Sequence, residues 1–525
     1  MTARLRSRDA LRGHARRWVR GGLLSAALVI TAPARLRAQL DHGGAPLPGG
    51  DAHWYLRSRA LLGDDAANPW GTRAQEPLPA RGPHIRWLRP ELRATYNSRR
   101  PEDADDGVVW AGRGVTGSAQ AGFEARWGIV HLQIAPVAFR TENRAFPLAE
   151  NGQTGLLRFG DARFPGTIDL PQRFGDAPYA RVDAGDSFLA LEWRGLTAGV
   201  SSARQLWGPA REFPLVLGTR AGGFTHLFVG TDGPVRLGVG TVDARLIAGR
   251  LEQTTWSPLQ AGENRRFHSG LTVTVRPRWT PWLEIGGNRT ETSRWPEGGP
   301  TLADALGPFR GIMNAGNTSS LQLTGSNGFA SAFTRVAIPG SGLEFYGEVS
   351  WEDFANDLRR FVQKIDDLNT VTLGVGRAWS APGGRLHWLG LELTNGEVAH
   401  QERGQRGFVA AFPPYTHAPT VQGLTSHGQV LGSLATFLGS AATLSYQRYG
   451  ADGRIGLHLR RALQLDGTTS IPPQVALSAM LSVLRFSGRR EWLAEVGPTY
   501  LTRGSRAVGG GDGGAISATL RWRGF

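Results

Sequence analysis

Apolar and polar residues alternate with a period of two over several long segments of this chain. In segment 271–279 one face carries apolar residues: Leu271, Val273, Val275, Pro277 and Trp279. The opposite face carries polar residues: Thr272, Thr274, Arg276 and Arg278. The same alternation occurs in four other segments: 239–248, 343–352, 388–394 and 475–484. A period of two predicts β-strands whose two faces meet different environments.

Three features favour a transmembrane barrel over a soluble sandwich. The polar faces carry full charges, which a hydrated lumen tolerates, and Trp279 and Trp351 stand at strand ends, where an aromatic girdle belongs. The segments are about 9–11 residues long, the length of a tilted membrane strand. We therefore predict an all-β fold, a transmembrane antiparallel β-barrel of about 16–18 strands.

Charged residues on the polar faces predict an ion-pair ladder in the barrel lumen, with a solvated sheet face as the simpler alternative. The predicted ladder has five members: Arg276, Arg278, Glu284, Glu344 and Glu348.

Residues 1–38 are typical of a secretory signal peptide. Seven arginines between positions 4 and 20 precede a short apolar run at 21–32, and Ala34 and Ala38 offer small residues for cleavage. We expect cleavage after Ala38, with Ala34 as the second choice. No later stretch approaches 18 consecutive apolar residues, so helical membrane spans are not expected.

The segment 39–107 is interrupted by prolines, and we predict that it forms a short periplasmic N-terminal segment. A helix is expected from Asp51, as N-cap, to Gly63, as C-cap, near or in the barrel mouth. Alternation begins near Val108, so the barrel is predicted to span 108–525. The last residue, Phe525, resembles the signal that the barrel-insertion machinery reads, and this machinery is an expected partner.

Composition and motifs argue against several functions. The formal net charge is +15, but residues 1–38 hold nine arginines and one aspartate and contribute +8 of it. The remaining charge is spread along the chain, and nucleic-acid binding is not expected because it needs clustered charge. The chain has no cysteine and no nucleophile elbow, zinc motif or phosphate-binding loop. We therefore predict no enzyme activity, no cofactor and no metal site.

Segment 183–252 contains three short motifs in sequence: a Trp-Gly-Pro turn at 207–209, a short apolar strand at 215–217 and a strand that ends in Gly-x-Leu-Glu at 249–252. In these motifs and their order the segment resembles the capsule assembly protein Wzi family. Two further segments look like parts of that family: 142–176 and 348–357. The chain departs from the family's best-known member, which has a sizeable periplasmic helical bundle near its start, because the corresponding segment here is short and interrupted by prolines.

The resemblance implies an outer-membrane barrel of about eighteen strands with a lectin-like role, the attachment of capsular polysaccharide or exopolysaccharide at the cell surface. Aromatic rings suit the C–H faces of sugars, and arginine suits acidic groups. The candidate carbohydrate-binding residues are Trp207, Arg204, Arg211, Arg220 and His226. The alternatives are a structural turn or girdle role for Trp207 and contact of the loop arginines with lipopolysaccharide phosphates.

We expect a monomer in the outer membrane, in contact with its lipid and lipopolysaccharide. The alternative function is a porin-like diffusion channel, and a barrel enzyme is a third reading.

Overall fold

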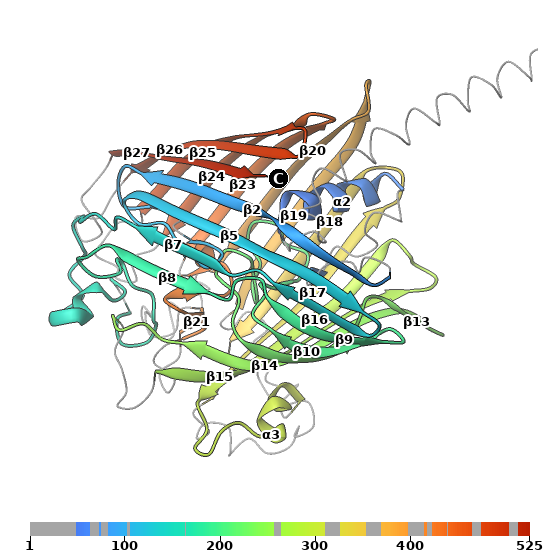
Figure 1. The fold of residues 1–525 in the computed structure, drawn as a ribbon, viewed down its shortest axis with the longest axis horizontal. Helices are drawn as coiled ribbons and strands as arrows, with labels where there is room; N and C mark the ends of the chain where they lie inside the picture. The colour runs from blue at the N-terminus through green and yellow to red at the C-terminus, as the bar shows by residue number, and fades with distance from the viewer. Residues whose placement is uncertain are drawn as a thin grey trace, which may run out of the picture.

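The computed structural model describes these residues: 49–63, 73–74, 82–101, 105–162, 164–256, 264–309, 326–352, 369–396, 414–416, 423–437, 439–464, 474–502 and 513–524. They form a closed antiparallel β-barrel of 18 strands (Figure 1). The predicted signal peptide and Phe525 lie outside the described residues. None of the helices in the described ranges has the length and apolar character needed to span a membrane.

Fifteen barrel strands are continuous: β2 (His84–Asn97), β5 (Gly114–Trp127), β10 (Leu196–Ser201), β14 (Gly240–Glu252), β15 (Arg265–Pro277), β16 (Leu283–Arg294), β17 (Ser326–Ile338), β18 (Leu343–Glu352), β19 (Asn369–Ala381), β20 (Arg385–Asn395), β23 (Gly439–Gly450), β24 (Gly453–Gln464), β25 (Gln474–Ser487), β26 (Arg490–Thr502) and β27 (Gly513–Arg523). Three strands are interrupted: β6 (Val130–Ile134) with β7 (Val137–Thr141), β8 (Tyr179–Asp183) with β9 (Phe188–Trp193), and β12 (His226–Thr231) with β13 (Val235–Leu237).

The structure also contains short strands and helices that are not part of the barrel wall. Three two-residue ribbons are β1 (Arg73–Ala74) with β11 (Leu206–Trp207), β3 (Asp105–Asp106) with β4 (Val109–Trp110), and β21 (Thr425–Ser426) with β22 (Gln429–Val430). The helices are α2 (Asp51–Leu61), α3 (Leu302–Ala305) and the 3-10 turns η1 (Gly155–Phe159) and η3 (Leu434–Thr436).

The barrel closes where β27 pairs with both β26 and β2, as Figure 1 shows. The barrel therefore begins at His84, in β2, and not at 108. The alternation did not predict β2, because the strand contains Pro90 and its register shifts between Leu88 and Glu91. This β-bulge reverses the alternation, so the outward apolar positions are odd-numbered before it and even-numbered after it: Ile85 and Trp87, then Leu92 and Tyr96.

The predicted alternation matches the two faces of the wall. In β20, Leu389, Leu391 and Leu393 are exposed on the outside, whereas Glu392 and Thr394 are buried inside. In β15 the inward Thr272 and Thr274 are likewise buried. The outer face is apolar and the inner face polar, as a bilayer and a hydrated lumen require.

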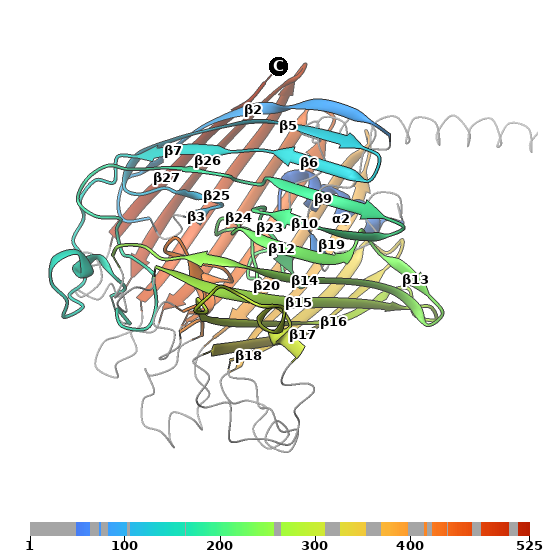
Figure 2. The ribbon, with the colours of Figure 1, turned by 60° about the horizontal axis from the view of Figure 1, so that its bottom comes forward.

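Tight turns and long loops lie at opposite ends of the barrel. Six exposed tryptophans stand on the outer face near the tight turns: Trp87, Trp127, Trp193, Trp279, Trp282 and Trp492. Outer-membrane barrels have short periplasmic turns and an aromatic girdle at each interface, so the tight-turn end faces the periplasm. In Figures 1 and 2 the tight turns near β13 lie at the right, and η1 among the long loops lies at the left in Figure 1.

The helix α2 lies inside the barrel, against the inner wall (Figure 1). Its Tyr55 and Leu56 share an apolar cluster with the inward side chains of Trp388 and Tyr449. The carbonyl oxygen of Leu61 accepts hydrogen bonds from two backbone N–H groups of the β17–β18 turn. The expected helix is therefore present at the periplasmic mouth, although its caps are Gly50 and Leu62 and not Asp51 and Gly63.

Candidate functional site

The lumen holds a second apolar core, made by loops that fold back from the long-loop end. We call residues 202–225 together with 414–416 and 423–437 the plug. Plug side chains form one buried cluster with inward side chains of the wall: Trp207, Val216, Leu217, Phe224, Tyr415, Leu424 and Leu431 from the plug, and Phe188, Phe228, Ile247 and Phe329 from the wall. This core fills one side of the barrel.

The carboxylate of Glu392, on the inner face of β20, holds the plug through its backbone. Oε2 accepts from the N–H of Arg211 at 2.8 Å, and Oε1 accepts from the N–H groups of Glu212 at 3.0 Å and Phe213 at 2.7 Å. The hydroxyl of Tyr346 donates to Oε2 at 2.5 Å. Because hydrogen bonds to an ionised group are the strong ones, this carboxylate fixes the turn at 211–213 to the wall.

Strand β18 supplies two more carboxylates to the same side. Glu352 accepts from the backbone N–H of Tyr415 at 3.0 Å, and the Tyr415 hydroxyl donates to the carbonyl of Leu215 at 2.9 Å, which joins the two parts of the plug. Glu348 accepts from Ser331 at 2.7 Å and Asn288 at 3.2 Å. On the polar face of β18 that the alternation predicted, Glu352 therefore holds the plug, whereas Glu348 joins β18 to the neighbouring wall.

Three members of the predicted ladder belong to one chain of ion pairs. Arg276 contacts Glu284 at 2.5 Å. Arg335 then joins Glu284 at 3.2 Å to Glu344 at 2.9 Å. The other two predicted members lie elsewhere, since Arg278 is exposed at a hairpin turn and Glu348 belongs to the Ser331 and Asn288 network.

Sequence reasoning missed Arg335 and Arg57 as links in this chain. Arg57 of α2 lies 3.0 Å from Glu344 and donates to the carbonyl oxygen of Pro209 at 2.7 Å, so it joins helix, wall and plug. The inward position of Arg335 could have been read from the alternation in β17. The contact of Arg57 depends on where the helix docks, and no sequence pattern signals that.

Two of the predicted carbohydrate-binding residues are buried, Trp207 in the plug and His226 at the start of the wall strand β12. Trp207 has no exposed surface, and its Nε1 donates to Oε1 of Gln205 at 2.9 Å. His226 is also buried, 2.7 Å from the Gln205 side chain. Neither ring offers a face to a glycan, so the alternative reading of Trp207 as a structural turn residue matches its position.

The other three predicted residues, Arg204, Arg211 and Arg220, line a cavity of about 540 Å³ on the opposite side of the lumen. It extends from Arg99 at the long-loop end to Trp54 of α2. Ten arginines line it: Arg93, Arg99, Arg100, Arg204, Arg211, Arg220, Arg454, Arg460, Arg521 and Arg523. Six carboxylates line it: Asp51, Glu91, Asp106, Asp186, Glu212 and Glu495. The lining therefore has four more arginines than carboxylates, and Glu491, which contacts Arg521 and Arg523 from outside the lining, lowers this difference to three.

The loop arginines of this cavity differ in their surroundings. Arg204 contacts Asp186 at 2.7 Å; burial alone would lower the pKa of Arg204, but this carboxylate raises it. Burial, and secondarily the positive charge of Arg460, lower the pKa of Arg220 to about 9. Arg204 is therefore held by a close carboxylate, whereas Arg220 lies 3.7 Å from the nearest oxygen of Glu212.

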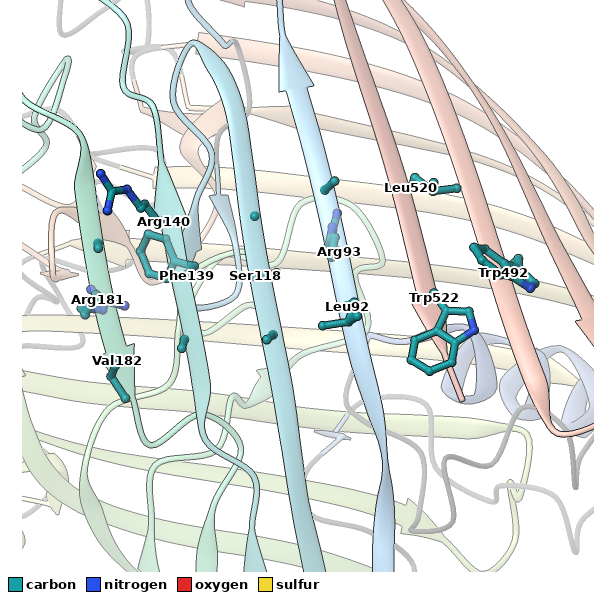
Figure 3. Close-up of a pocket in the computed structure, with 15 residues that line it drawn as sticks. Leu92, Arg93, Ser118, Phe139, Arg140, Arg181, Val182, Trp492, Leu520 and Trp522 are labelled. Atoms are coloured by element: carbon teal, nitrogen blue, oxygen red, sulfur yellow. The ribbon is translucent and has the colours of Figure 1, made fainter. Parts of the chain in front are cut away.

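A larger hollow of about 1020 Å³ lies on the outside of the barrel (Figure 3). Leu92, Leu520 and Trp522 line it from β2 and β27, with Val182 at its other edge. It is apolar and faces the bilayer, so the polar cavity inside the barrel is the better candidate site. No group of three or more metal-ligating side chains occurs among the described residues.

Comparisons with known proteins support the fold. No family model matches the chain, and no curated protein sequence matches it. Wzi of Escherichia coli, an outer-membrane carbohydrate-binding β-barrel involved in group 1 capsule assembly, is 14% identical with a TM-score of 0.55, over 82% of this chain and 83% of Wzi. OprD and OpdQ of Pseudomonas aeruginosa are 10% and 8% identical, each with a TM-score of 0.39. The alignment with OprD covers 84% of this chain and 93% of OprD. The alignment with OpdQ covers 83% of this chain and 97% of OpdQ.

At these identities the similarity to Wzi is one of fold. Together with the apolar outer face and the girdle, the closed barrel identifies an outer-membrane protein.

Proposed function

We propose that this barrel attaches capsular polysaccharide or exopolysaccharide to the cell surface. The plug is the observation that carries the proposal. Loops from the extracellular end fill one side of the lumen and are fixed there by Glu392 and Glu352. A barrel filled in this way suits holding a polymer better than passing solutes, and the role needs no catalysis.

Two further observations support the proposal. The Trp-Gly-Pro turn at 207–209, which resembles the Wzi family, lies within the plug. The fold is similar to that of Wzi, which is a carbohydrate-binding barrel.

Polysaccharide retention in a strain that lacks the gene tests this function. We expect normal total synthesis with polymer shed into the medium, and restored attachment when the wild-type gene is returned. If attachment to cells is unchanged in the deletion strain, the proposed function is wrong.

A porin-like channel is the second candidate, and the charged cavity favours it because that cavity runs along the lumen beside the plug. Planar-bilayer recordings of the purified barrel decide between the two. Steady anion-selective conductance would support the channel, whereas a closed baseline would support the attachment protein.

A further inference from the structure

The outer face of the barrel carries a group of basic and aromatic side chains near its periplasmic end. Three neighbouring strands supply it: β19, β20 and β23 (Figure 1). On β20 the outward residues are odd-numbered, as the exposed Leu389 shows, so Arg385 and His387 face outward as well. Both lie next to the tight turn that joins β19 to β20, which places them where the bilayer meets the periplasm.

The strands on either side of β20 complete the group. Trp379 of β19 lies directly opposite His387, and Arg448 of β23 lies opposite His387 on the other side. Arg377 precedes Trp379 by two positions, and Tyr446 precedes Arg448 by two, so each shares the face of its partner. We call these six outward residues the basic patch: Arg377, Trp379, Arg385, His387, Tyr446 and Arg448.

The aromatic rings of the basic patch pack against one another. The rings of Trp379 and His387 are stacked with their centroids 5.2 Å apart, and the ring of Tyr446 lies 6.0 Å from that of His387. The hydroxyl of Tyr446 is hydrogen-bonded to Nδ1 of His387 at 2.8 Å. When this hydroxyl donates, the neutral imidazole carries its proton on Nε2, which can then donate to another group. Aromatic rings with polar tips are typical of the headgroup region of a membrane.

The three arginines of the basic patch have no acidic partner. Arg377, Arg385 and Arg448 are exposed, and within the described ranges no side chain forms an ion pair with any of them. Asp452, in the β23–β24 turn, contacts Arg485 instead. An arginine on the lipid side of a barrel is tolerated near the interface, where it can reach anionic headgroups. Three positive charges are therefore available here to an anionic ligand.

An exposed apolar surface continues from the basic patch toward the middle of the bilayer. The next outward positions on the three strands are Val375, Leu389 and Leu444. Leu373 and Leu391 follow them, and all five side chains are exposed. A ligand whose charged head lies on the patch can lay hydrocarbon chains along these residues. This arrangement matches the head and tails of a lipid.

We propose that the basic patch binds an anionic glycerophospholipid of the periplasmic leaflet. Arg377, Arg385 and Arg448 donate N–H groups to phosphate oxygens, and the rings pack against the glycerol and the first methylene groups. A lipid with two phosphates, such as cardiolipin, satisfies more of the three arginines than a lipid with one. The site does not rest on the proposed function, because it lies on the outer face and not in the lumen.

Native mass spectrometry of the purified full-length barrel, released from detergent, tests the site with three lipids of equal chain length: cardiolipin, phosphatidylglycerol and phosphatidylcholine. We expect cardiolipin to stay bound most strongly and phosphatidylglycerol less strongly, whereas phosphatidylcholine, which has no net charge, does not stay bound. Arg385→Gln and Arg448→Gln should each weaken the binding of cardiolipin by about fivefold, the effect of one charge at an anionic surface.

Arg194→Gln is the matched control. Arg194 is also an exposed arginine at a tight turn, and it lies 4.8 Å from the ring of Trp193, but the β9–β10 hairpin does not pair with β19, β20 or β23. This variant removes the same charge and should change the affinity less than about twofold. Arg448→Lys keeps the charge and should retain most of the binding. Heat-modified migration on gels confirms that each variant folds.

Binding that falls in Arg385→Gln and Arg448→Gln but not in Arg194→Gln upholds the site, whether or not gene deletion sheds polysaccharide. Equal weakening in all three variants would overturn it, because the response would then be to net charge. The site is also wrong if the wild type retains no cardiolipin, or retains phosphatidylcholine as well as phosphatidylglycerol. Alginate, a soluble acidic polysaccharide, probes a different partner. If it displaces cardiolipin and its own binding depends on Arg385 and Arg448, the patch binds a periplasmic polymer and not a lipid.

Discussion

The two sides of the lumen are built from the same alternating strands but are filled in different ways. On the side of β17–β20, carboxylates of the wall accept hydrogen bonds from the backbone of the plug, and an apolar core closes behind them. On the side of β24–β27, carboxylates of the cavity contact arginines instead. A polar inner face therefore does not decide by itself whether a barrel is packed or hollow; the partner brought to it decides.

The largest effect is expected at the centre of the packed side. Trp207→Ala should lower the free energy of unfolding by about 4 kcal/mol, because it empties the space of a fully buried side chain. Chemical unfolding in detergent, followed by circular dichroism, measures it. Trp492→Ala, on the exposed outer face, is the control and should have a much smaller effect. Equal effects for the two would mean that the plug does not stabilise the barrel.

The link between wall and plug comes next. Glu392→Ala removes the acceptor of three N–H groups, one buried and two partly buried, and we expect a loss of about 3 kcal/mol. The plug should also loosen, which planar-bilayer recordings would detect as new conductance. Glu392→Gln keeps one carbonyl acceptor and should lie between the alanine variant and the wild type. If Glu392→Ala changes neither the free energy of unfolding nor the conductance, the apolar core alone holds the plug.

A smaller, pH-dependent effect is expected at the mouth. Burial first, and then Arg57, Arg211 and Arg335, lower the pKa of His53 to about 3. The unfolded chain takes up a proton as the pH falls through 6.5, but the folded protein does not until about pH 3. Stability should therefore fall on acidification between these values, by up to about 1.4 kcal/mol per pH unit.

Melting temperatures at pH 7.5 and 5.0 measure this slope. His53→Asn is the matched variant, because its side-chain oxygen can still accept the Gly49 N–H that now binds Nδ1 at 3.1 Å. The slope should be shallower in this variant. An identical slope in both proteins would assign the acid sensitivity to other groups.

The smallest effect is expected on the hollow side. Ser478 lines the cavity from β25, and Ser478→Ala should change the free energy of unfolding by less than about 0.5 kcal/mol. The same unfolding measurement applies. A loss comparable to that of Glu392→Ala would mean that this side is packed as well, and the contrast between the two sides would disappear.

Much of the wall could be predicted from the sequence because its cause is local. Successive residues of a strand point to opposite faces, so the alternation at 271–279 and 343–352 fixes which side chains face lipid and which face the lumen. The strand β2 was not predicted, because the bulge at Pro90 changes the phase of the alternation. The pairing of Arg276 with Glu284 was within reach for the same reason, since both lie on polar faces beside one hairpin.

The contents of the lumen depended on the tertiary structure. Contacts between residues far apart in the chain bury Trp207 and bring Arg57 to Glu344. Contacts of the same kind place arginines around Glu212. Alternation gives each strand a polar face but does not say which loop or helix will cover it. The alternation along each strand was enough to predict a barrel with two different faces, whereas the places where the lumen is filled or hollow depend on long-range contacts in the folded chain.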